Sequence, residues 1–184
     1  MIGAESGREI VEERVVLLTE PSQRIALGKV GETPLLSINR DFSAPVIVEA
    51  ERAAGELERL AETDPNAFTR YEALQELMMR ALLAGVRGET PDTEPVIAAI
   101  GSTLRSNSLD AAFKAEALLV PSESLIGDRL DMGDPEAVHS SRELLRGALG
   151  AALSDALAAA QSRGAPGDVL WYVAQGLRGA GAGA

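Results

Sequence analysis

The residue types that most often carry out chemistry are scarce in this sequence, and their spacing fits no catalytic or metal-binding pattern. There is no cysteine and one histidine, His139. The chain therefore cannot supply a thiolate nucleophile, a cysteine-based zinc or iron–sulfur site, or a pair of imidazole ligands. His139 lies near Arg142 and Glu143 in an expected helix, and we interpret it as a solvent-facing helical residue. We predict no catalytic, cofactor-binding or metal-binding residue in this chain.

Three weaker patterns also fail on spacing. Asp128, Asp131 and Asp134 recur at every third position, whereas a helix–loop–helix calcium site needs oxygen ligands at alternate positions and a glutamate at the twelfth. Asp134 precedes a proline and is better explained as a helix cap. The segment Gly3–Gly7 places its serine one position too late for a nucleophile elbow. Gly28–Val30 lacks the upstream glycine and the following Ser or Thr of a phosphate-binding loop.

The charge balance excludes further classes of protein. The 184 residues include 28 acidic and 17 basic side chains, which gives a formal charge of −11. A binder of the nucleic-acid backbone needs a basic stripe, so we expect no nucleic-acid partner. No stretch reaches the roughly 18 apolar residues of a membrane span, and the charged N-terminus has no apolar core of a signal peptide. Together with the absence of cysteine, this predicts a cytoplasmic protein.

The hydrophobic period indicates strands in the first 50 residues. Residues 13–18 form an apolar, β-branched run, and residues 24–30 alternate between polar and apolar. Residues 35–38 and 46–48 also have strand character, and turn signals separate the four segments. Four short strands are a small core for an independent domain. We therefore predict part of a β-sandwich.

From Ala53 onward the period becomes helical. The clearest helix is expected to begin at Asp64-Pro65, with Asp64 as cap and the proline in the first turn. Leu77 and Leu83 lie outside its main apolar stripe, so we expect this helix to pack on more than one neighbour. The main apolar stripe of this helix consists of Phe68, Tyr71, Leu74, Met78, Ala81, Leu82 and Gly85. Further helices are expected at about 93–106, 109–119, 122–130 and 135–162, which suggests an irregular α-solenoid.

The last twenty residues differ in composition from the rest of the chain. The run Gly164–Gly167 should end the preceding helix, and the chain closes on alternating glycine and alanine. Such a composition is low in complexity and buries little apolar surface. We predict that residues 164–184 form a tail that is poorly ordered or that packs only opportunistically, through Trp171 and Tyr172.

Several blocks in order and in register from about residue 8 to residue 160 resemble the zinc-dependent gluzincin aminopeptidases of the bacterial aminopeptidase N family. The block ending in Phe42–Val46 is the most specific of them. The blocks are Thr19–Ile25, Pro34–Val46, Phe68–Ala73, Leu119–Ser124, Asp131–His139 and Arg142-Glu143.

The resemblance implies an α+β chain without the catalytic domain. Residues 1–50 would be the last strands of an immunoglobulin-like β-sandwich, and residues 51–163 the start of an α-superhelical domain. The His-Glu-x-x-His zinc site and the Gly-Ala-Met-Glu-Asn exopeptidase motif of the family have no counterpart here. The implied role is therefore a non-catalytic C-terminal part of a zinc aminopeptidase that walls the substrate chamber. The alternative is a stand-alone acidic helical scaffold that binds a basic partner.

The expected partners follow from the incomplete sandwich. Half a sandwich leaves strand edges with unpaired N–H and C=O groups beside an uncovered apolar face. We expect these edges to meet the missing catalytic part of the parent enzyme or a second copy of this chain. A closed two-fold dimer is the commonest solution for the second case.

Overall fold

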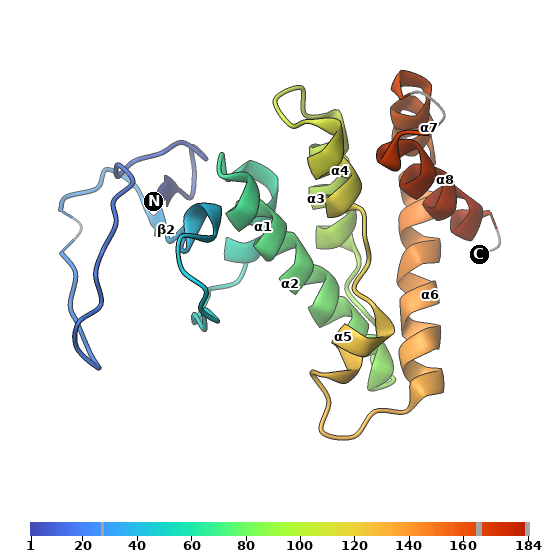
Figure 1. Cartoon of the computed structure of the whole chain (residues 1–184), viewed down its shortest axis with the longest axis horizontal. Coiled ribbons are helices and arrows are strands. Elements are labelled where there is room, and N and C mark those ends of the chain that lie inside the picture. Colours follow the sequence, from blue (N-terminus) through green and yellow to red (C-terminus); the bar gives the residue numbers. More distant parts are fainter. Residues whose placement is uncertain (27, 165–166, 183–184) are drawn as a thin grey trace.

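The computed structural model describes residues 1–26, 28–164 and 167–182. An irregular N-terminal segment lies at one end of the molecule and a stack of helices forms the rest (Figure 1). This order confirms the predicted α+β class, with an immunoglobulin-like part before a solenoid-like helical part. The division of the chain near residue 50 remains a prediction.

The N-terminal segment contains little regular sheet. Strand β1 (Ile2–Gly3) pairs antiparallel with β2 (Pro34–Leu35), so that Ile2 lies opposite Leu35. Both side chains are buried and belong to the same apolar cluster as Leu57 and Leu60. Two apolar residues, from the start and the middle of the segment, thus anchor it to the helical core.

Most of the predicted strands do not form ladders in the described chain. Of the four, only residues 35–38 overlap a strand, at β2, while residues 13–18, the described part of 24–30 and 46–48 have no strand assignment. The sequence pattern was nonetheless that of strands, with apolar β-branched residues. A strand needs a neighbour to accept its backbone hydrogen bonds, and within the described residues these segments have none.

A loop at the start of the chain is tied to the first helix by polar contacts. The Glu32 carboxylate accepts the backbone N–H groups of Glu5 and Ser6 and the Ser6 hydroxyl, at 2.6–3.1 Å. Arg59 donates to the carbonyl oxygens of Ala4 and Glu5, at 2.9 and 2.6 Å. The loop therefore depends on one carboxylate and one guanidinium group.

The helices begin after Gly55, whose φ of +83° suits glycine. Helix α2 (Ala67–Val86) packs on α1 (Glu56–Thr63), α3 (Glu94–Arg105) and α6 (Pro135–Ala152), which agrees with the prediction that it has several neighbours. Successive helices then stack away from the N-terminal segment (Figure 1). Their bounds are α1 (Glu56–Thr63), α2 (Ala67–Val86), α3 (Glu94–Arg105), α4 (Ala111–Ala117), α5 (Glu123–Gly127), α6 (Pro135–Ala152), α7 (Ser154–Arg163) and α8 (Val169–Gly181). Among the described helices, none combines the length and apolarity needed to cross a membrane.

The long helix expected from 135 to about 162 is two helices. Leu153 leaves the helical conformation, at φ −108° and ψ 15°, and separates α6 from α7. After this break α7 packs against α3 and α8, and Leu157 and Ala160 become buried. Burial of that apolar stripe against neighbouring helices favours the bend over a straight helix.

The prediction of a poorly ordered tail is wrong for residues 169–181. They form α8, which packs on α4, α6 and α7 and buries Leu170, Ala174 and Leu177. The small residues that suggested low complexity allow a close helix crossing, because Gly150 of α6 faces Gly181. A Cβ atom built on Gly150 would lie 2.6 Å from the Gly181 nitrogen. Residues 165–166 and 183–184 of the predicted tail lie outside the described residues.

We expect Gly150→Ala to destabilise the chain by about 1–3 kcal/mol, because the added methyl group overpacks the α6–α8 crossing. Gly176→Ala is the matched control, since its Cβ would meet nothing within 4 Å. In a helix interior that substitution should be neutral or stabilising by up to about 1 kcal/mol. Urea unfolding followed by circular dichroism measures both. Equal effects of the two substitutions would show that α8 does not dock on α6.

We expect the N-terminal loop to release its contacts with Glu32 in acid. The Ser6 hydroxyl and backbone hydrogen bonds lower the pKa of Glu32 below its ordinary value of 4.5. The contact is therefore complete above pH 4.5 and is lost as pH falls through the lowered pKa. Amide NMR signals of Glu5 and Ser6 should shift in this range and should stop doing so in Glu32→Gln. Pronounced titration of these amides in the variant would contradict the assignment.

Candidate functional site: the junction between the two parts

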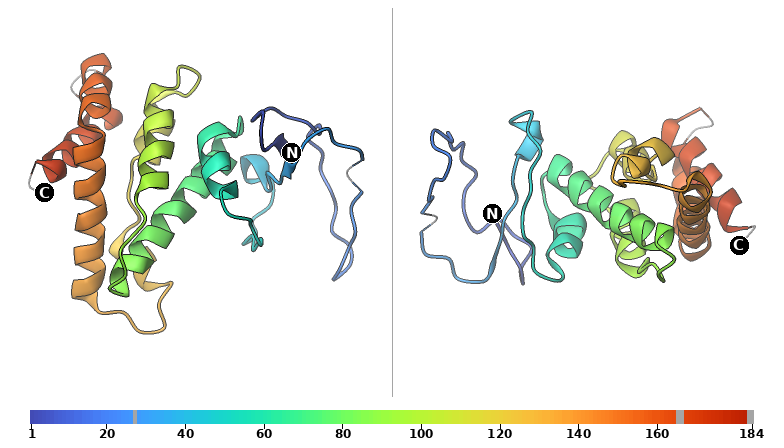
Figure 2. Two further views of the ribbon diagram at one scale, coloured as in Figure 1. Left: turned by 180° about the vertical axis from the view of Figure 1, so that it is seen from behind. Right: turned by 90° about the horizontal axis from the view of Figure 1, so that it is seen from below.

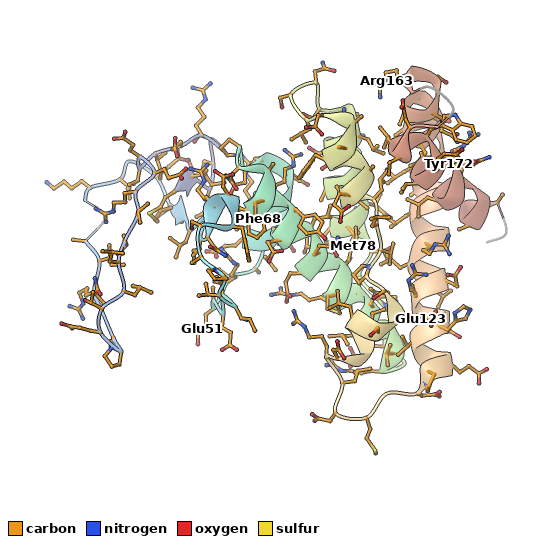
Figure 3. All side chains as sticks on the ribbon, in the orientation of Figure 1. Glu51, Phe68, Met78, Glu123, Arg163 and Tyr172 are labelled. Atoms are coloured by element: carbon orange, nitrogen blue, oxygen red, sulfur yellow. The ribbon has the colours of Figure 1, made fainter. Side chains whose placement is uncertain are left out.

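The histidine and the aspartates considered as candidate ligands, Asp128, Asp131, Asp134 and His139, are exposed on the helical stack. His139 is exposed on α6, and its Nδ1 lies 2.8 Å from Oε1 of Glu123, which begins α5 (Figure 3 labels Glu123). This confirms a solvent-facing helical histidine. Asp134 caps α6, as predicted, by accepting the N–H of Glu136 at 2.9 Å.

In the part of the chain that the structure describes, no group of three or more His, Asp or Glu side chains is arranged so that it could hold a metal ion. The predictions of no metal and no catalytic residue are not tested by this observation. The candidate site lies at the junction, where the N-terminal segment meets the helices.

The turn Arg40–Phe42 has an unusual backbone conformation. Asn39, Asp41 and Phe42 have φ values of +54°, +54° and +55°, a left-handed region that non-glycine residues rarely adopt. The Asn39 side chain supports the turn by accepting the N–H of Ala44 at 2.9 Å. Such conformations cost about 1–3 kcal/mol each and persist where surrounding contacts hold them.

The turn docks on the start of α2 through one asparagine. Asn66 donates to Oδ1 of Asp41 at 2.8 Å, and its own Oδ1 caps α2 by accepting the N–H of Thr69 at 3.1 Å. The ring of Phe42 also contacts that of Phe68, with centroids 5.5 Å apart. One side chain thus both starts the helix and holds the turn.

The cap of α2 was predicted two residues too early. Asp64 does not cap the helix; its Oδ1 accepts the N–H of Asn66 at 2.8 Å, and Asn66 takes the capping position. The Asp64 side chain is fully buried and lies beside Arg40. Its negative charge is used in an ion pair, so the helix start moves to the next residue that offers a side-chain acceptor.

Arg40 joins both ends of the N-terminal segment to the helical stack. Its guanidinium group lies 2.8 Å from Glu9, 2.7 Å from Glu13 and 3.7 Å from Asp64, and its side chain is 11% exposed. Burial alone would lower the pKa of Arg40, but the Glu9 hydrogen bond and the charges of Asp64, Glu13 and Glu9 outweigh it. The pKa of Arg40 is therefore raised.

A second arginine lies on the helical side of the buried Asp64. Arg70 donates to the Ser102 hydroxyl of α3 at 3.2 Å. Burial lowers the pKa of Arg70, opposed by the charges of Asp64 and Glu62. The negative charge of Asp64 thus acts to raise the pKa of both arginines, Arg40 in the N-terminal segment and Arg70 in α2. The junction is held by charge at its centre and by the Asn66 contacts at its edge.

A groove with a volume of about 830 Å³ lies beside the junction. Residues 46–50 line it, together with Tyr71 and Met79 of α2 and Leu125 of α5. In Figure 3, Phe68 near the start of α2 and Glu51 in the connection before α1 mark this region. Burial raises the pKa of Glu72, which also lines the groove.

The groove carries mixed charge rather than a convergent catalytic set. Glutamates and arginines line it in equal number, together with aliphatic side chains. This mixture suits contact with a polypeptide, whose surface offers both signs of charge and apolar groups. The charged lining residues are Glu49, Glu72, Glu76, Arg52, Arg80 and Arg129.

Arg40, Asn66 and Arg70 were not predicted from the sequence to be functional residues. Two signals pointed toward them. The block Pro34–Val46, which contains Arg40, was the most specific part of the family resemblance, and Asp64-Pro65 was recognised as a helix start. What the pattern could not supply was the pairing of Arg40 with Asp64, which lies far along the chain from it.

Two family models match the chain in the same order as the two parts of the structure. A model described as a domain of unknown function (DUF3458) with an Ig-like fold matches residues 1–51. A second, described as a domain of unknown function (DUF3458_C) with ARM repeats, matches residues 54–170.

The chain is also similar to curated aminopeptidases. It is 31% identical to aminopeptidase N of Caulobacter vibrioides over 156 residues, which are 84% of this chain and 18% of that protein. It is 30% identical to aminopeptidase N of Escherichia coli over 151 residues, 79% of this chain and 17% of that protein. The chain therefore spans about a fifth of the length of these relatives.

A solved structure shares the fold. A crystal structure of Legionella pneumophila aminopeptidase A in complex with aspartic acid superimposes with a TM-score of 0.79 at 23% identity. The match covers 97% of this chain and 22% of that one. The agreement of both family models, the relatives and the fold leads to one assignment. The chain belongs to the DUF3458 family, as an Ig-like segment followed by ARM repeats that are homologous to the C-terminal region of aminopeptidase N.

Proposed function

We propose that this chain is a non-catalytic C-terminal part of an aminopeptidase N-like enzyme and forms part of the wall of its substrate chamber. The observation that carries the proposal is the charged junction, which joins an Ig-like segment to the first ARM helices in one fixed relation. Such a joint suits a scaffold that holds a chamber wall in place. The parent reaction is the removal of N-terminal amino acids from peptides.

The catalytic groups must come from another part of that enzyme. Zinc-dependent hydrolysis uses a metal ion to polarise the peptide carbonyl and to activate water. The sequence of this chain contains one histidine and no His-Glu-x-x-His pattern. The residues of this chain would instead shape and restrict access to the site, which is a steric role.

The proposed partner is the catalytic part of the enzyme. The apolar side chains exposed on the N-terminal segment, among them Val15, Leu17 and Ile47, offer the surface that this partner would cover. A cytoplasmic setting is proposed as well, because the absence of cysteine suits a reducing compartment.

A chimera tests the proposed role. The matched 156-residue segment of Caulobacter aminopeptidase N would be exchanged for the corresponding residues of this chain. We expect hydrolysis of an aminoacyl-anilide within about tenfold of the parent, or about 1.4 kcal/mol of transition-state stabilisation. This chain alone should show no hydrolysis and no stoichiometric zinc after dialysis.

A second substrate separates the chamber role from general support. The chimera should cleave short peptides and leave folded proteins intact, as expected of a walled site. A folded chimera that cleaves both alike would refute the chamber role. A chimera that folds but lacks activity, beside an active parent, would favour the alternative of a stand-alone acidic scaffold.

The junction itself is expected to contribute strongly to stability. Arg40→Ala should cost about 3 kcal/mol, because it leaves the buried Asp64 charge without its partner. Arg80→Ala is the control: Arg80 forms an exposed ion pair with Glu76, worth about 0.5 kcal/mol or less. Adding Asp64→Asn to Arg40→Ala should recover part of the loss. Urea unfolding measures the three variants beside the unaltered chain, and similar losses for both arginines would contradict the proposed role of the junction.

A further inference from the structure

An exposed arm extends from the N-terminal end of the molecule. Its described residues, 12–26 and 28–30, project away from the helices in both views of Figure 2. The arm is fixed at its base, where Glu13 contacts Arg40 at 2.7 Å. Beyond this point Val15, Leu17 and Leu18 are 86%, 77% and 74% exposed. An apolar run of this kind in water is a surface that lacks its partner.

The backbone of the arm is also unpaired. Within its described residues, no backbone–backbone hydrogen bond is formed. Side chains tie the two limbs together instead: Arg14 donates to the carbonyl of Ala26 at 2.7 Å, and Gln23 donates to that of Leu17 at 3.2 Å. Residues 14–18 thus keep most of their N–H and C=O groups free for a ladder.

The segment 46–50 has the complementary properties. It lines the groove beside α2, and Ile47 is 94% exposed. Of its described backbone N–H groups, only that of Val46 makes a backbone hydrogen bond, within its own turn to Ala44. This segment therefore offers unpaired backbone groups next to a groove that can receive side chains.

We propose that residues 14–18 of one copy of this chain pair with residues 46–50 of a second copy, and that the same contact forms in reverse. The pairing concerns copies of this chain to which the catalytic part proposed above is not bound, because that partner would cover the same residues, Leu17 and Ile47. Both segments fall within the Ig-like match at residues 1–51, a fold in which strands are paired. Each chain carries one donor strand and one acceptor edge, so reciprocal pairing closes a two-fold dimer without leaving either segment unpaired.

The two segments match in length and in apolar character. Each is a short run that spans about 17 Å as a strand. Antiparallel pairing of Leu17 with Ile47 sets Leu18 against Val46 and Val16 against Val48. The same register sets Arg14 against Ala50 and Val15 against Glu49, so the three apolar pairs, and not charge complementarity, would hold the contact. Because each copy carries a charge of −11, association should strengthen when salt screens the repulsion.

Light scattering coupled to size exclusion tests the dimer in the full chain. We expect twice the mass of one chain, with the dimer favoured by added salt. Leu17→Glu or Ile47→Lys should each weaken association at least about 100-fold, because the two-fold axis doubles the loss of one buried apolar contact. Met132→Lys and Met132→Glu are matched controls at a residue that is 95% exposed outside both segments.

A mixture of the two variants tests reciprocity. In a mixed dimer, one of the two contacts has the native residues at both positions. The other contact sets the glutamate introduced by Leu17→Glu against the lysine introduced by Ile47→Lys. We expect the mixture to recover dimer that neither variant forms alone. Recovery requires arm and edge to come from different copies, and its absence would overturn the proposed pairing.

Disulfide cross-linking determines whether the two paired segments come from one copy or from two. Because the chain has no native cysteine, only the introduced cysteines can form the disulfide. The double variant Leu17→Cys, Ile47→Cys should give a disulfide-linked dimer on a non-reducing gel, and Met132→Cys, Ile47→Cys should not. The proposal is overturned by a monomer at every concentration and salt level tested. It is equally overturned by a disulfide within one chain, by a dimer that resists both single substitutions, or by one that the Met132 controls also abolish.

Discussion

The buried carboxylate of Asp64 is the constraint on which the organisation of this chain depends. A carboxylate removed from water requires compensating charge, because its desolvation is costly. Arg40 supplies that charge from the N-terminal segment, and Arg70 contributes from α2. Arg40 is in turn held by Glu9 and Glu13. A single buried charge therefore fixes where the N-terminal segment, the strained turn and the start of α2 lie relative to one another.

The contacts of the junction explain the left-handed turn at Asn39–Phe42. Three non-glycine residues at positive φ are unfavourable on their own. The turn aims Arg40 at Asp64 while Asp41 reaches Asn66 and Phe42 reaches Phe68. The electrostatic and packing contacts of these three consecutive side chains stabilise the strained conformation of the turn. The junction is accordingly a point of fixed geometry between two parts with very different amounts of regular structure.

The two parts differ because helices satisfy their backbone groups locally, whereas strands rely on neighbours. The ARM-type helices pack into a continuous apolar cluster that reaches from α1 to α8. The Ig-like segment contributes Ile2 and Leu35 to that cluster and leaves its apolar strand-like residues in water. The Ig-like model matches residues 1–51, and strands of such a fold pair within two packed sheets, whereas the described residues of this segment form one two-stranded ladder.

The sequence by itself determined the fold class, most helices, the family and the cap at Asp134. These features depend on local periodicity and on short sequence blocks. Both can be recognised without knowing which distant residues are in contact. Tertiary structure decided the rest. The break at Leu153, the docking of α8 through Gly150 and Gly181, and the use of Asp64 in an ion pair all depend on what lies opposite in space. The strand segments are the clearest case: alternation specifies a side chain's face, but a ladder exists only where a partner backbone is present.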